Sequence, residues 1–283
     1  AVRRLMIRMN ILTGSLMNSM TSFRSCTGGD MMNKVVFITG GGTGIGQGIS
    51  IEFAKAGYNV AFSYRGSAQG AKETARAIEN LGRRVLAVKA DVSNVDEIHQ
   101  MFERVITEFS RIDVFINNAG ITEKSDFLST TPELFDRICR VDYRGAFFCI
   151  QRAAQIMSDK NIKGSIILIS SNNATAHFAD VAVYGSAKAA AEKMAEHAAI
   201  ELAKYGIRVN SIKPGWTDTG SERLDAKEDT YYKIPLKKWA TVKEIGQTAL
   251  YLSSDAAASV TGTSIVIDNG ALLVSDKRER YGY

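Results

Sequence analysis

The sequence has few cysteines and histidines and no long apolar run. Its 283 residues include three cysteines and three histidines. Cys26, Cys139 and Cys149 lack the spacing of metal ligands and form no even disulfide framework. We therefore expect no metal site and a reducing, cytoplasmic location, with Cys139 and Cys149 as buried free thiols. No apolar stretch approaches the roughly 18 residues typical of a membrane-spanning helix, so we expect no membrane contact.

A strong charge imbalance is also missing from most of the chain. The formal net charge is +5, and residues 1–30 supply much of it, with four arginines against one aspartate. No basic stripe with interleaved aromatic residues follows, which argues against nucleic acid as a partner. Residues 1–31 have the composition of an organellar transit peptide, and Met31 or Met32 looks like a natural start. We interpret residues 1–31 as a leader, either a transit peptide directing organellar import or an expression artefact, and 32–283 as one domain.

Strand-like and helix-like segments alternate from Lys34 onward. Continuous apolar, β-branched runs cover residues 35–39, 59–64, 84–92, 114–117, 165–170, 208–214 and 264–268. Such runs are typical of strands that are buried on both faces. Helical patterns lie between them, and Thr131 before Pro132 is typical of a helix start. The sequence predicts an α/β fold, a doubly wound parallel sheet of about seven strands with helices on both faces.

A glycine-rich loop follows the first predicted strand and leads into the first predicted helix. Residues 38–48 read ITGGGTGIGQG. Gly40 permits a sharp turn, while Gly44 and Gly46 remove side chains where a pyrophosphate must approach. The helix opening near Gly44 offers free N–H groups and a positive dipole end. A glycine turn without a ligand is the alternative, but the strand before and the helix after favour a Rossmann-type dinucleotide site.

The end of the second predicted strand bears on which dinucleotide is bound. NAD sites place a carboxylate there for the ribose hydroxyl, whereas an arginine accommodates the additional phosphate of NADP. The chain reads Ser63, Tyr64, Arg65 and has no acidic residue at this point. A solvated loop arginine is the alternative. We predict NADP(H) as the preferred cofactor, with NAD(H) possible.

Tyr184 and Lys188 are separated by three small residues, in the sequence YGSAK. Positions i and i+4 share a face of a helix, so the phenol and the ammonium could act at one point. The simpler alternative is an amphipathic helix with a half-buried tyrosine and a solvated lysine.

The glycine loop and this pair together resemble the short-chain dehydrogenase/reductase family, from Lys34 to about Gly270. Other family-like landmarks follow in order, namely Asp91-Val92, NNAG at 117–120, Ser171, and Pro214-Gly215 with Thr217 and Thr219. Within the family, FSYRGS, NIKGSIILISS and ELAKYGIRVNSIKPG are most similar to bacterial glucose 1-dehydrogenases. The 3-oxoacyl carrier-protein reductases share many of the same stretches.

The resemblance implies a cofactor site made of four segments. The glycine loop and the second strand end would bind the phosphates, the next segment the adenine, NNAG the adenosine ribose, and the last segment the nicotinamide. Asn117 is expected to be structural. The implied binding residues are Gly40, Thr43, Gly44, Ile45, Gly46 and Arg65, then Asp91 and Val92, then Asn118, Ala119 and Gly120, then Pro214, Gly215, Thr217 and Thr219, with Tyr184 and Lys188.

The resemblance also gives the phenol a task, the transfer of a proton at the oxygen of an alcohol or ketone. A free phenol loses its proton only near pH 10 or so, and an ammonium one turn away stabilises the phenolate. Lys188 would also bond the nicotinamide ribose. Ser171 would hold the substrate oxygen, and its neighbour Ser170 serves as a structural control because the family spacing favours Ser171.

One position departs from the family pattern. Asp142, in RVDYRGAFF, stands where the family has an asparagine that supports a water-mediated relay to the lysine. An aspartate keeps an acceptor oxygen and adds a charge that favours protonated Lys188 and disfavours a phenolate. We count Asp142 with the catalytic residues and expect a working enzyme with a shifted pH optimum.

The substrate is less constrained by the sequence. Asn172, Asn173, His177 and Trp216 are expected to face the pocket with Phe178, and residues 220–239 to form a lid. This polar and aromatic mixture favours a sugar, polyol or related small hydroxy compound as substrate.

Two other functions stay open. Lys233, Lys237 and Lys238 could meet an acidic carrier protein, as a 3-oxoacyl-thioester reductase would require, although a solvated basic face is the alternative. A catalytically silent NADP(H)-binding protein is the third hypothesis, and Asp142 is its only support. The resemblance further implies a homotetramer in which long helices, such as 141–157 and 184–205, pack across interfaces.

Overall fold

The computed structural model describes residues 33–220 and 233–274. Within them, a seven-stranded parallel sheet has the order β3-β2-β1-β4-β5-β6-β9. The strands confirm the seven predicted runs, with bounds that differ by a few residues at most. They are β1 (Val35–Ile38), β2 (Asn59–Tyr64), β3 (Val85–Lys89), β4 (Val114–Asn117), β5 (Ser165–Ile169), β6 (Arg208–Pro214) and β9 (Ser264–Ile267). β7 (Thr217–Asp218) and β8 (Ala240–Thr241) form a separate small pair.

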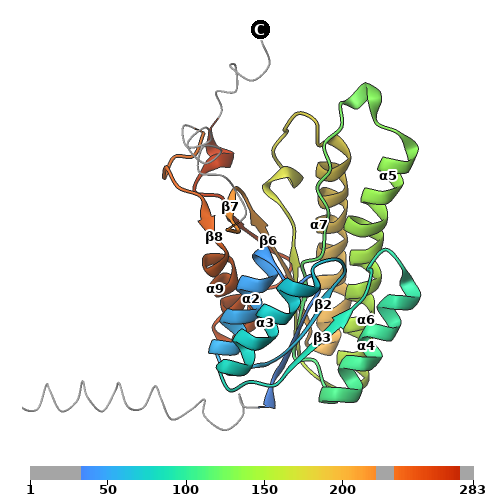
Figure 1. Ribbon diagram of the computed structural model, residues 1–283, viewed down its shortest axis with the longest axis vertical. Helices are drawn as coiled ribbons and strands as arrows, with labels where there is room; N and C mark the ends of the chain where they lie inside the picture. The colour runs from blue at the N-terminus through green and yellow to red at the C-terminus, as the bar shows by residue number, and fades with distance from the viewer. Residues whose placement is uncertain (1–32, 221–232, 275–283) are drawn as a thin grey trace, which may run out of the picture.

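Helices cover both faces of the sheet (Figure 1). One layer contains α2 (Gly44–Lys55), α3 (Ala68–Asn80) and α9 (Val242–Ser253), and the other contains α4 (Val95–Phe109), α6 (Ala146–Asp159) and α7 (Ala182–Leu202). α5 (Pro132–Cys139) lies beside the upper half of α7. Short helical turns are η2 (Phe127–Ser129), η4 (Asn172–Ala174), η5 (Ala203–Tyr205), η6 (Asp255–Ala257) and η7 (Ala271–Leu273).

Every strand of the seven-stranded sheet except the edge strand β9 supplies both hydrophobic cores, because successive side chains point to opposite faces. Phe37 of β1 packs in the core under α4, α6 and α7, together with Phe102 and Phe115. Its neighbours Val36 and Ile38 pack in the other core, under α2, α3 and α9. This double burial explains why the strands read as continuous apolar runs rather than alternating ones.

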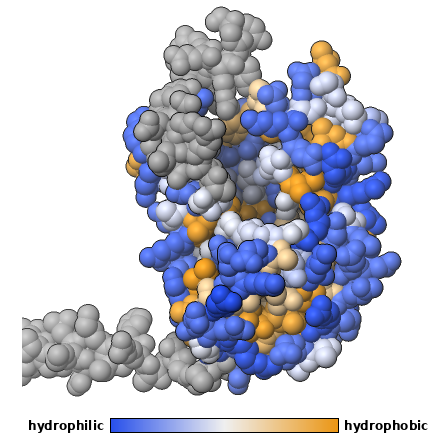
Figure 2. Space-filling view, in the orientation of Figure 1, coloured by the Kyte–Doolittle hydropathy of each residue, from blue (hydrophilic) through white to orange (hydrophobic). Residues whose placement is uncertain are grey.

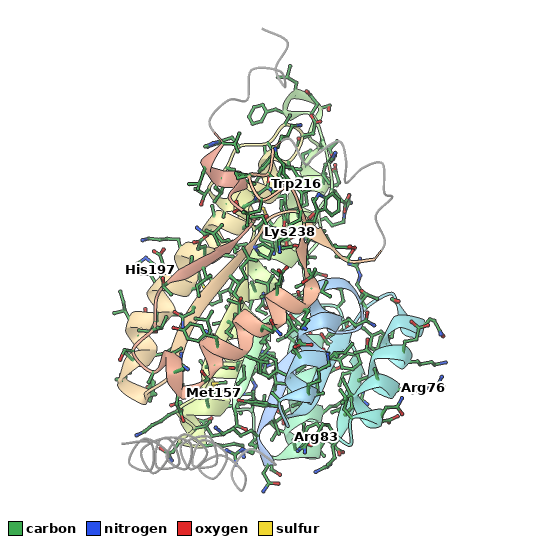
Figure 3. All side chains as sticks on the ribbon, turned by 90° about the vertical axis from the view of Figure 1, so that its left-hand side faces the viewer. Arg76, Arg83, Met157, His197, Trp216 and Lys238 are labelled. Atoms are coloured by element: carbon green, nitrogen blue, oxygen red, sulfur yellow. The ribbon has the colours of Figure 1, made fainter. Side chains whose placement is uncertain are left out.

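The chain order places a crevice at the centre of the sheet. β1 lies next to both β2 and β4, so the chain runs outward from β1 to β3 and then returns to start the other half at β4. In such sheets, ligands bind beyond the carboxyl ends of the strands at this reversal. Trp216 and Lys238 mark the carboxyl end, and Arg83 and Met157 lie toward the opposite end (Figure 3).

The segment before α6 differs from the continuous helix that was expected over 141–157. α5 begins at Pro132 after the N-cap Thr131, whose side chain accepts a hydrogen bond from the Leu134 N–H, as predicted. A π-helical turn, η3 (Arg140–Gly145), then precedes α6. π-turns add one residue to a helix and often occur at functional sites. Gly145 lies in this turn because a side chain there would clash with the Val92 carbonyl.

The cysteine prediction is half right. Cys149 is fully buried in α6, and burial raises the pKa of its thiol. Cys139 is only half-buried, because the short α5 buries Ile138 alone and turns its other residues toward solvent. Cys26 lies outside the described residues, as does the predicted leader. Within residues 33–220 and 233–274, no helix meets the length and apolarity needed to cross a membrane, and no cluster of His, Cys, Asp and Glu has the makings of a metal site.

Candidate active site

A cleft of about 350 Å³ opens beyond the carboxyl ends of β1, β2, β3 and β4. The surface is hollowed at the level where these strands end (Figure 2). Ten of its lining residues were predicted from the sequence, namely Gly40, Thr43, Ile45, Gly46, Arg65, Asp91, Val92, Asn118, Ala119 and Gly120. Gly44, also predicted, lies between two of them in the chain. The cleft therefore brings together three of the four segments expected to hold a dinucleotide.

The glycine loop is shaped by two of its glycines. Gly40 has a φ of +68°, in the left-handed region that favours glycine. A Cβ on Gly46 would stand 2.1 Å from the Gly40 carbonyl oxygen and 2.6 Å from Asn118 Nδ2. The loop can therefore fold back on the start of α2 only because position 46 has no side chain.

The first turn of α2 is open to an anion. Thr43 is its N-cap residue, yet no side chain accepts a hydrogen bond at the cap, and no acidic residue lies in the first turn. The first N–H groups of a helix have no partner within the helix and lie at its positive dipole end. A pyrophosphate fits this position by charge and by hydrogen bonding, so the residues present are suited to a dinucleotide.

Asn118 lines the cleft and also holds the glycine loop in place. Its side-chain amide donates hydrogen bonds to the carbonyls of Thr39, at 3.0 Å, and Gly40, at 3.1 Å. The Thr39 hydroxyl in turn accepts hydrogen bonds from the N–H groups of Asn118 and Ala119, both at 3.0 Å. These contacts join the end of β4 to the glycine loop, and Asn117 is buried, as expected of a structural residue.

Arg65 lies at the rim of the cleft with a 57% exposed side chain. Its guanidinium is 3.7 Å from an oxygen of Asp91, whose other oxygen accepts a hydrogen bond from the Ser93 N–H. Both charged groups thus line the cleft at the carboxyl ends of β2 and β3. Arg65 remains open enough to meet a phosphate as well.

The fourth segment follows β6 and closes over the glycine loop. Thr217 donates a hydrogen bond to the Gly215 carbonyl at 3.0 Å, which folds the chain back after Pro214. A Cβ placed on Gly44 would meet the Thr219 side chain at 3.6 Å. The segment expected to embrace the nicotinamide therefore lies in contact with the segment expected to hold the phosphates.

Tyr184 and Lys188 lie on the first two turns of α7. The Lys188 side chain is buried, and its Nζ donates a hydrogen bond to the Ile169 carbonyl at the end of β5, at 3.3 Å. The same Nζ is 5.8 Å from the centroid of the Tyr184 ring. Tyr184 is half-buried, so its side chain keeps access to solvent while the lysine is enclosed. The alternative of a solvated lysine is wrong.

Lys188 makes a buried ion pair with Asp142 of the π-turn. Nζ is 3.0 Å from Asp142 Oδ1, with side-chain exposures of 5% and 0%. The second carboxylate oxygen accepts a hydrogen bond from the Ile121 N–H at 3.2 Å. Burial raises the pKa of Asp142 above its usual range despite the adjacent ammonium. For Lys188, burial alone would lower the pKa, but Asp142 and Tyr184 reverse that effect and raise it.

Ser171 follows β5, two residues beyond the carbonyl that Lys188 bonds. Its hydroxyl oxygen accepts hydrogen bonds from Asn173, from the backbone N–H at 3.2 Å and the side-chain amide at 3.3 Å. With both bonds accepted, the hydroxyl proton is left to donate elsewhere. A Cβ on Gly185 would stand 3.1 Å from the Asn173 carbonyl, which places this turn against the start of α7. Ser170 is buried, and its hydroxyl has no hydrogen-bond partner among the described residues.

The predicted substrate residues occupy different depths. Asn172 is buried against Gly215, whereas His177 is exposed. Trp216 is half-buried and meets Phe178 edge to face, with ring centroids 5.7 Å apart. This aromatic pair joins the segment after β5 to the segment after β6. Most of the predicted lid, residues 221–232, lies outside the described residues.

Six residues of the cleft were missed from the sequence. Ser63, Tyr64, Gly66, Ala90, Ile121 and Val141 also line it. Ser63 and Ala90 stand at or just beyond the carboxyl ends of β2 and β3, a position that would have identified them once the strands were placed. Val141 comes from the π-turn, which no sequence pattern indicated.

Comparison with known proteins was made at the level of sequence and of structure. The sequence model of a family described as Enoyl-(Acyl carrier protein) reductase matches residues 40–271. An L-rhamnose-1-dehydrogenase from Scheffersomyces stipitis is 37% identical over 250 residues, covering 86% of this chain and 97% of the relative. A 3-oxoacyl-[acyl-carrier-protein] reductase, FabG, from Staphylococcus aureus is 34% identical over 244 residues, covering 84% and 98%.

A solved structure agrees with these sequence matches. The crystal structure of an acetoin dehydrogenase from Enterobacter cloacae superposes with a TM-score of 0.82 at 32% identity. The superposition covers 87% of this chain and 98% of that protein. The likeness therefore extends over nearly the whole length of each relative.

Proposed function

The chain belongs to the short-chain dehydrogenase/reductase family of nicotinamide-dependent oxidoreductases, and from this premise we propose that it moves hydride between NADP(H) and a sugar, polyol or related small hydroxy compound. The observation that carries the proposal is the meeting of two assemblies at one edge of the sheet. The dinucleotide cleft and the buried Lys188 beneath Tyr184 share the segment after β4, where Gly120 lines the cleft and a Cβ on it would stand 3.0 Å from Lys188 Nζ. The bound nicotinamide supplies or accepts the hydride, and the protein must handle the proton.

Tyr184 is the proton donor and acceptor in this proposal. Its phenol is half-buried, one helical turn from an ammonium that is fixed by the end of β5. A proton transfer group held in this way contributes about 10²- to 10⁴-fold to a rate. Lys188 holds the phenol and the nicotinamide ribose in place, and Ser171 donates its free hydroxyl proton to the substrate oxygen.

The preference for NADP(H) rests on Arg65. It is the cation at the rim of the cleft at the end of β2, where the second ribose of the dinucleotide would lie. Asp91, 3.7 Å away, moderates its charge. NAD(H) is therefore accepted as a weaker second cofactor.

The proposed substrate class rests on polar groups and on the relatives. Asn173 stands beside Ser171, and Trp216 with Phe178 provides an aromatic surface of the kind on which sugar rings pack. Two of the relatives are named for L-rhamnose and for acetoin, both small hydroxy compounds with a carbonyl. The particular likeness to glucose 1-dehydrogenases stays a prediction.

Reduction of a 3-oxoacyl thioester is the second candidate, favoured by the match to FabG. Of the three lysines expected to meet an acidic carrier, Lys238 pairs with Glu244 at 3.1 Å, which reduces the charge available to a partner. A silent NADP(H)-binding protein is the third candidate, and the ion pair of Lys188 with Asp142 is the feature that would support it.

Steady-state nicotinamide absorbance separates these candidates. The protein is assayed with NADP(H) and NAD(H), in both directions, on aldoses, polyols, acetoin and a 3-oxoacyl thioester. Turnover of a hydroxy compound with NADP⁺ or of its carbonyl form with NADPH supports the first candidate. Turnover of the thioester alone supports the second, and tight NADPH binding without any turnover supports the third.

We also propose a homotetramer. A groove between α6 and α7 is flanked by exposed apolar side chains, including Phe147 and Ile200, the latter 77% exposed. Apolar helix faces of this kind are typical of interfaces between copies of a chain. Analytical ultracentrifugation should give four times the chain mass, and a monomer at micromolar concentration would contradict the proposal. The cytoplasmic location stays a prediction.

A further inference from the structure

The ion pair between Asp142 and Lys188 has consequences for the direction of the chemistry. Both side chains are almost completely enclosed, and their charged atoms are 3.0 Å apart. The Ile121 N–H and the Ile169 carbonyl hold the outer ends of the carboxylate and the ammonium. Two opposite charges fixed at this distance in a buried site offset each other's field strongly.

Tyr184 experiences the sum of these two charges. An unpaired ammonium 5.8 Å from its ring would stabilise a phenolate. With a carboxylate 3.0 Å from the same ammonium, the pair presents a dipole rather than a full positive charge. The phenol therefore gains much less from proton loss than it would beside an unpaired lysine.

The surrounding groups do not restore a positive charge. On α5, burial, Asp136 and then Asp142 raise the pKa of Cys139, so its thiol is neutral. In η3, Arg140 pairs with Asp136, and Arg144 lies over the Phe148 ring and bonds the Ser93 carbonyl.

On α7, the turn after Lys188 carries Glu192. Its carboxylate pairs with Lys213 at 2.8 Å and also accepts a hydrogen bond from Ser264. The ends of β4 and β5 contribute only the backbone groups already named. No described group therefore replaces the positive charge that Asp142 offsets.

We propose that Asp142 compensates the charge of Lys188, so that Tyr184 remains a neutral phenol at neutral pH and the site is set for proton donation, that is, for reduction of a carbonyl. The inference rests on the proposed function, because it assigns a direction to the same site. Asp142 acts through Lys188 and is a positioning residue in this role.

The step balances without a further reactant. The carbonyl carbon accepts a hydride, with its electron pair, from NADPH, and the π electrons of the C=O bond move to the oxygen. That oxygen takes the proton of Tyr184, whose O–H bond breaks to leave a phenolate. Solvent then returns a proton to the phenolate. The reverse reaction needs the phenolate at the start, so it requires a higher pH.

The test is the pH dependence of both directions, with the carbonyl and alcohol forms of one substrate. The substrates set the overall equilibrium, so the ratio of the two rates is not informative. The readout is the pH range over which each rate rises or falls, here called its pH limb. In the unmodified protein, oxidation should rise about tenfold per pH unit above pH 7 while reduction is near its plateau. An oxidation rate already at its plateau at pH 7 overturns the proposal without any variant.

Asp142→Asn removes the compensating charge and keeps the shape. The oxidation limb should move at least about one unit toward lower pH, which raises oxidation at pH 7 about tenfold. Asp136→Asn is the matched control, because it removes the same charge from an exposed position nearby and should leave the limb in place. An unmoved limb in Asp142→Asn, with NADPH binding retained as evidence of folding, contradicts the inference.

Failure of this inference can be told from failure of the proposed function. Absence of turnover in the unmodified protein with every substrate and both cofactors counts against the proposed function. Turnover with the wrong pH limbs counts against the role of Asp142 alone.

Discussion

The two halves of the site are built from different materials. The cofactor cleft after β1 to β4 is made mainly of backbone, with glycines at the closest approaches and one exposed arginine at its rim. The acid–base cluster under α7 is made of charged side chains removed from water, with Lys188 and Asp142 almost fully enclosed. Cofactor binding should therefore be lost when the shape of the cleft changes, and proton transfer should be lost when the charges of the cluster change.

Removal of the phenol hydroxyl should give the largest effect of any change in the cluster. Tyr184→Phe keeps the ring but leaves no group to donate or accept the proton. We expect kcat to fall about 10²- to 10⁴-fold, with the Kd for NADPH nearly unchanged. Steady-state kinetics and fluorescence titration with NADPH measure the two quantities. Ser170→Ala is the control, because this serine lies beside Ser171 but its hydroxyl has no hydrogen-bond partner among the described residues. An equal loss in both variants would contradict the assignment.

A change of shape in the cleft should give the next largest effect. In Gly46→Ala, the new methyl group would stand 2.1 Å from the Gly40 carbonyl oxygen, so the loop must shift. We expect NADPH affinity to fall about 10- to 100-fold. Gly66→Ala is the matched control, because Gly66 also lines the cleft but a Cβ there meets nothing within 4 Å. Equal affinities in the two variants would show that the glycine loop does not hold the cofactor.

Arg65 is the one part of the cleft that should act by charge. Arg65→Ala should weaken NADPH binding about tenfold, equivalent to about 1.4 kcal/mol, and change NADH binding little. Arg76→Ala is the control, because Arg76 points away from the body of α3 into solvent (Figure 3). Competitive titrations with both cofactors give the ratio. An unchanged ratio of NADPH to NADH affinity would remove Arg65 from the site.

The smallest effect is expected at the start of α9, outside both regions. Thr241 and Glu244 form a reciprocal capping box, and Thr241→Ala should lower the free energy of unfolding by about 1 kcal/mol. Hydrogen bonds from the Thr241 N–H and then from Lys238 lower the pKa of Glu244. Its contribution is therefore present above the ordinary glutamate pKa and is lost as the pH falls through the lowered value. Urea denaturation of Thr241→Ala measures the first effect, and urea denaturation of Glu244→Gln at several pH values measures the second. A cost of Glu244→Gln that persists fully in acid would contradict this account of the cap.

The cleft was more predictable from the sequence than the cluster, and for a physical reason. Glycine at close approaches and continuous apolar strands are local patterns that a chain displays in order. The strand ends then fix where the loops meet, so the residues around Gly40 and Asp91 were placed correctly. Asn118 was also placed in the cleft correctly, but its hydrogen bonds to the carbonyls of Thr39 and Gly40 were not predicted, because they join segments that are far apart in sequence.

The cluster depended on contacts that no local pattern records. The sequence indicated that Tyr184 and Lys188 share a face, but not that Lys188 would be enclosed. The ion pair forms because the π-turn at Arg140–Gly145 presents Asp142 to Lys188 of α7 and to the Ile121 N–H after β4. The sequence showed that Asp142 departs from the family pattern. It did not show that the carboxylate lies 3.0 Å from Lys188 Nζ, the distance at which it offsets the charge of the ammonium.

The central claim is that binding and proton transfer reside in separate regions, and one measurement tests it most directly. NADPH affinity and turnover are measured on the same preparations of Gly46→Ala and Tyr184→Phe. The account predicts that Gly46→Ala loses affinity while Tyr184→Phe keeps it and loses turnover. Loss of affinity in Tyr184→Phe equal to that in Gly46→Ala, or full turnover in Tyr184→Phe, would contradict it.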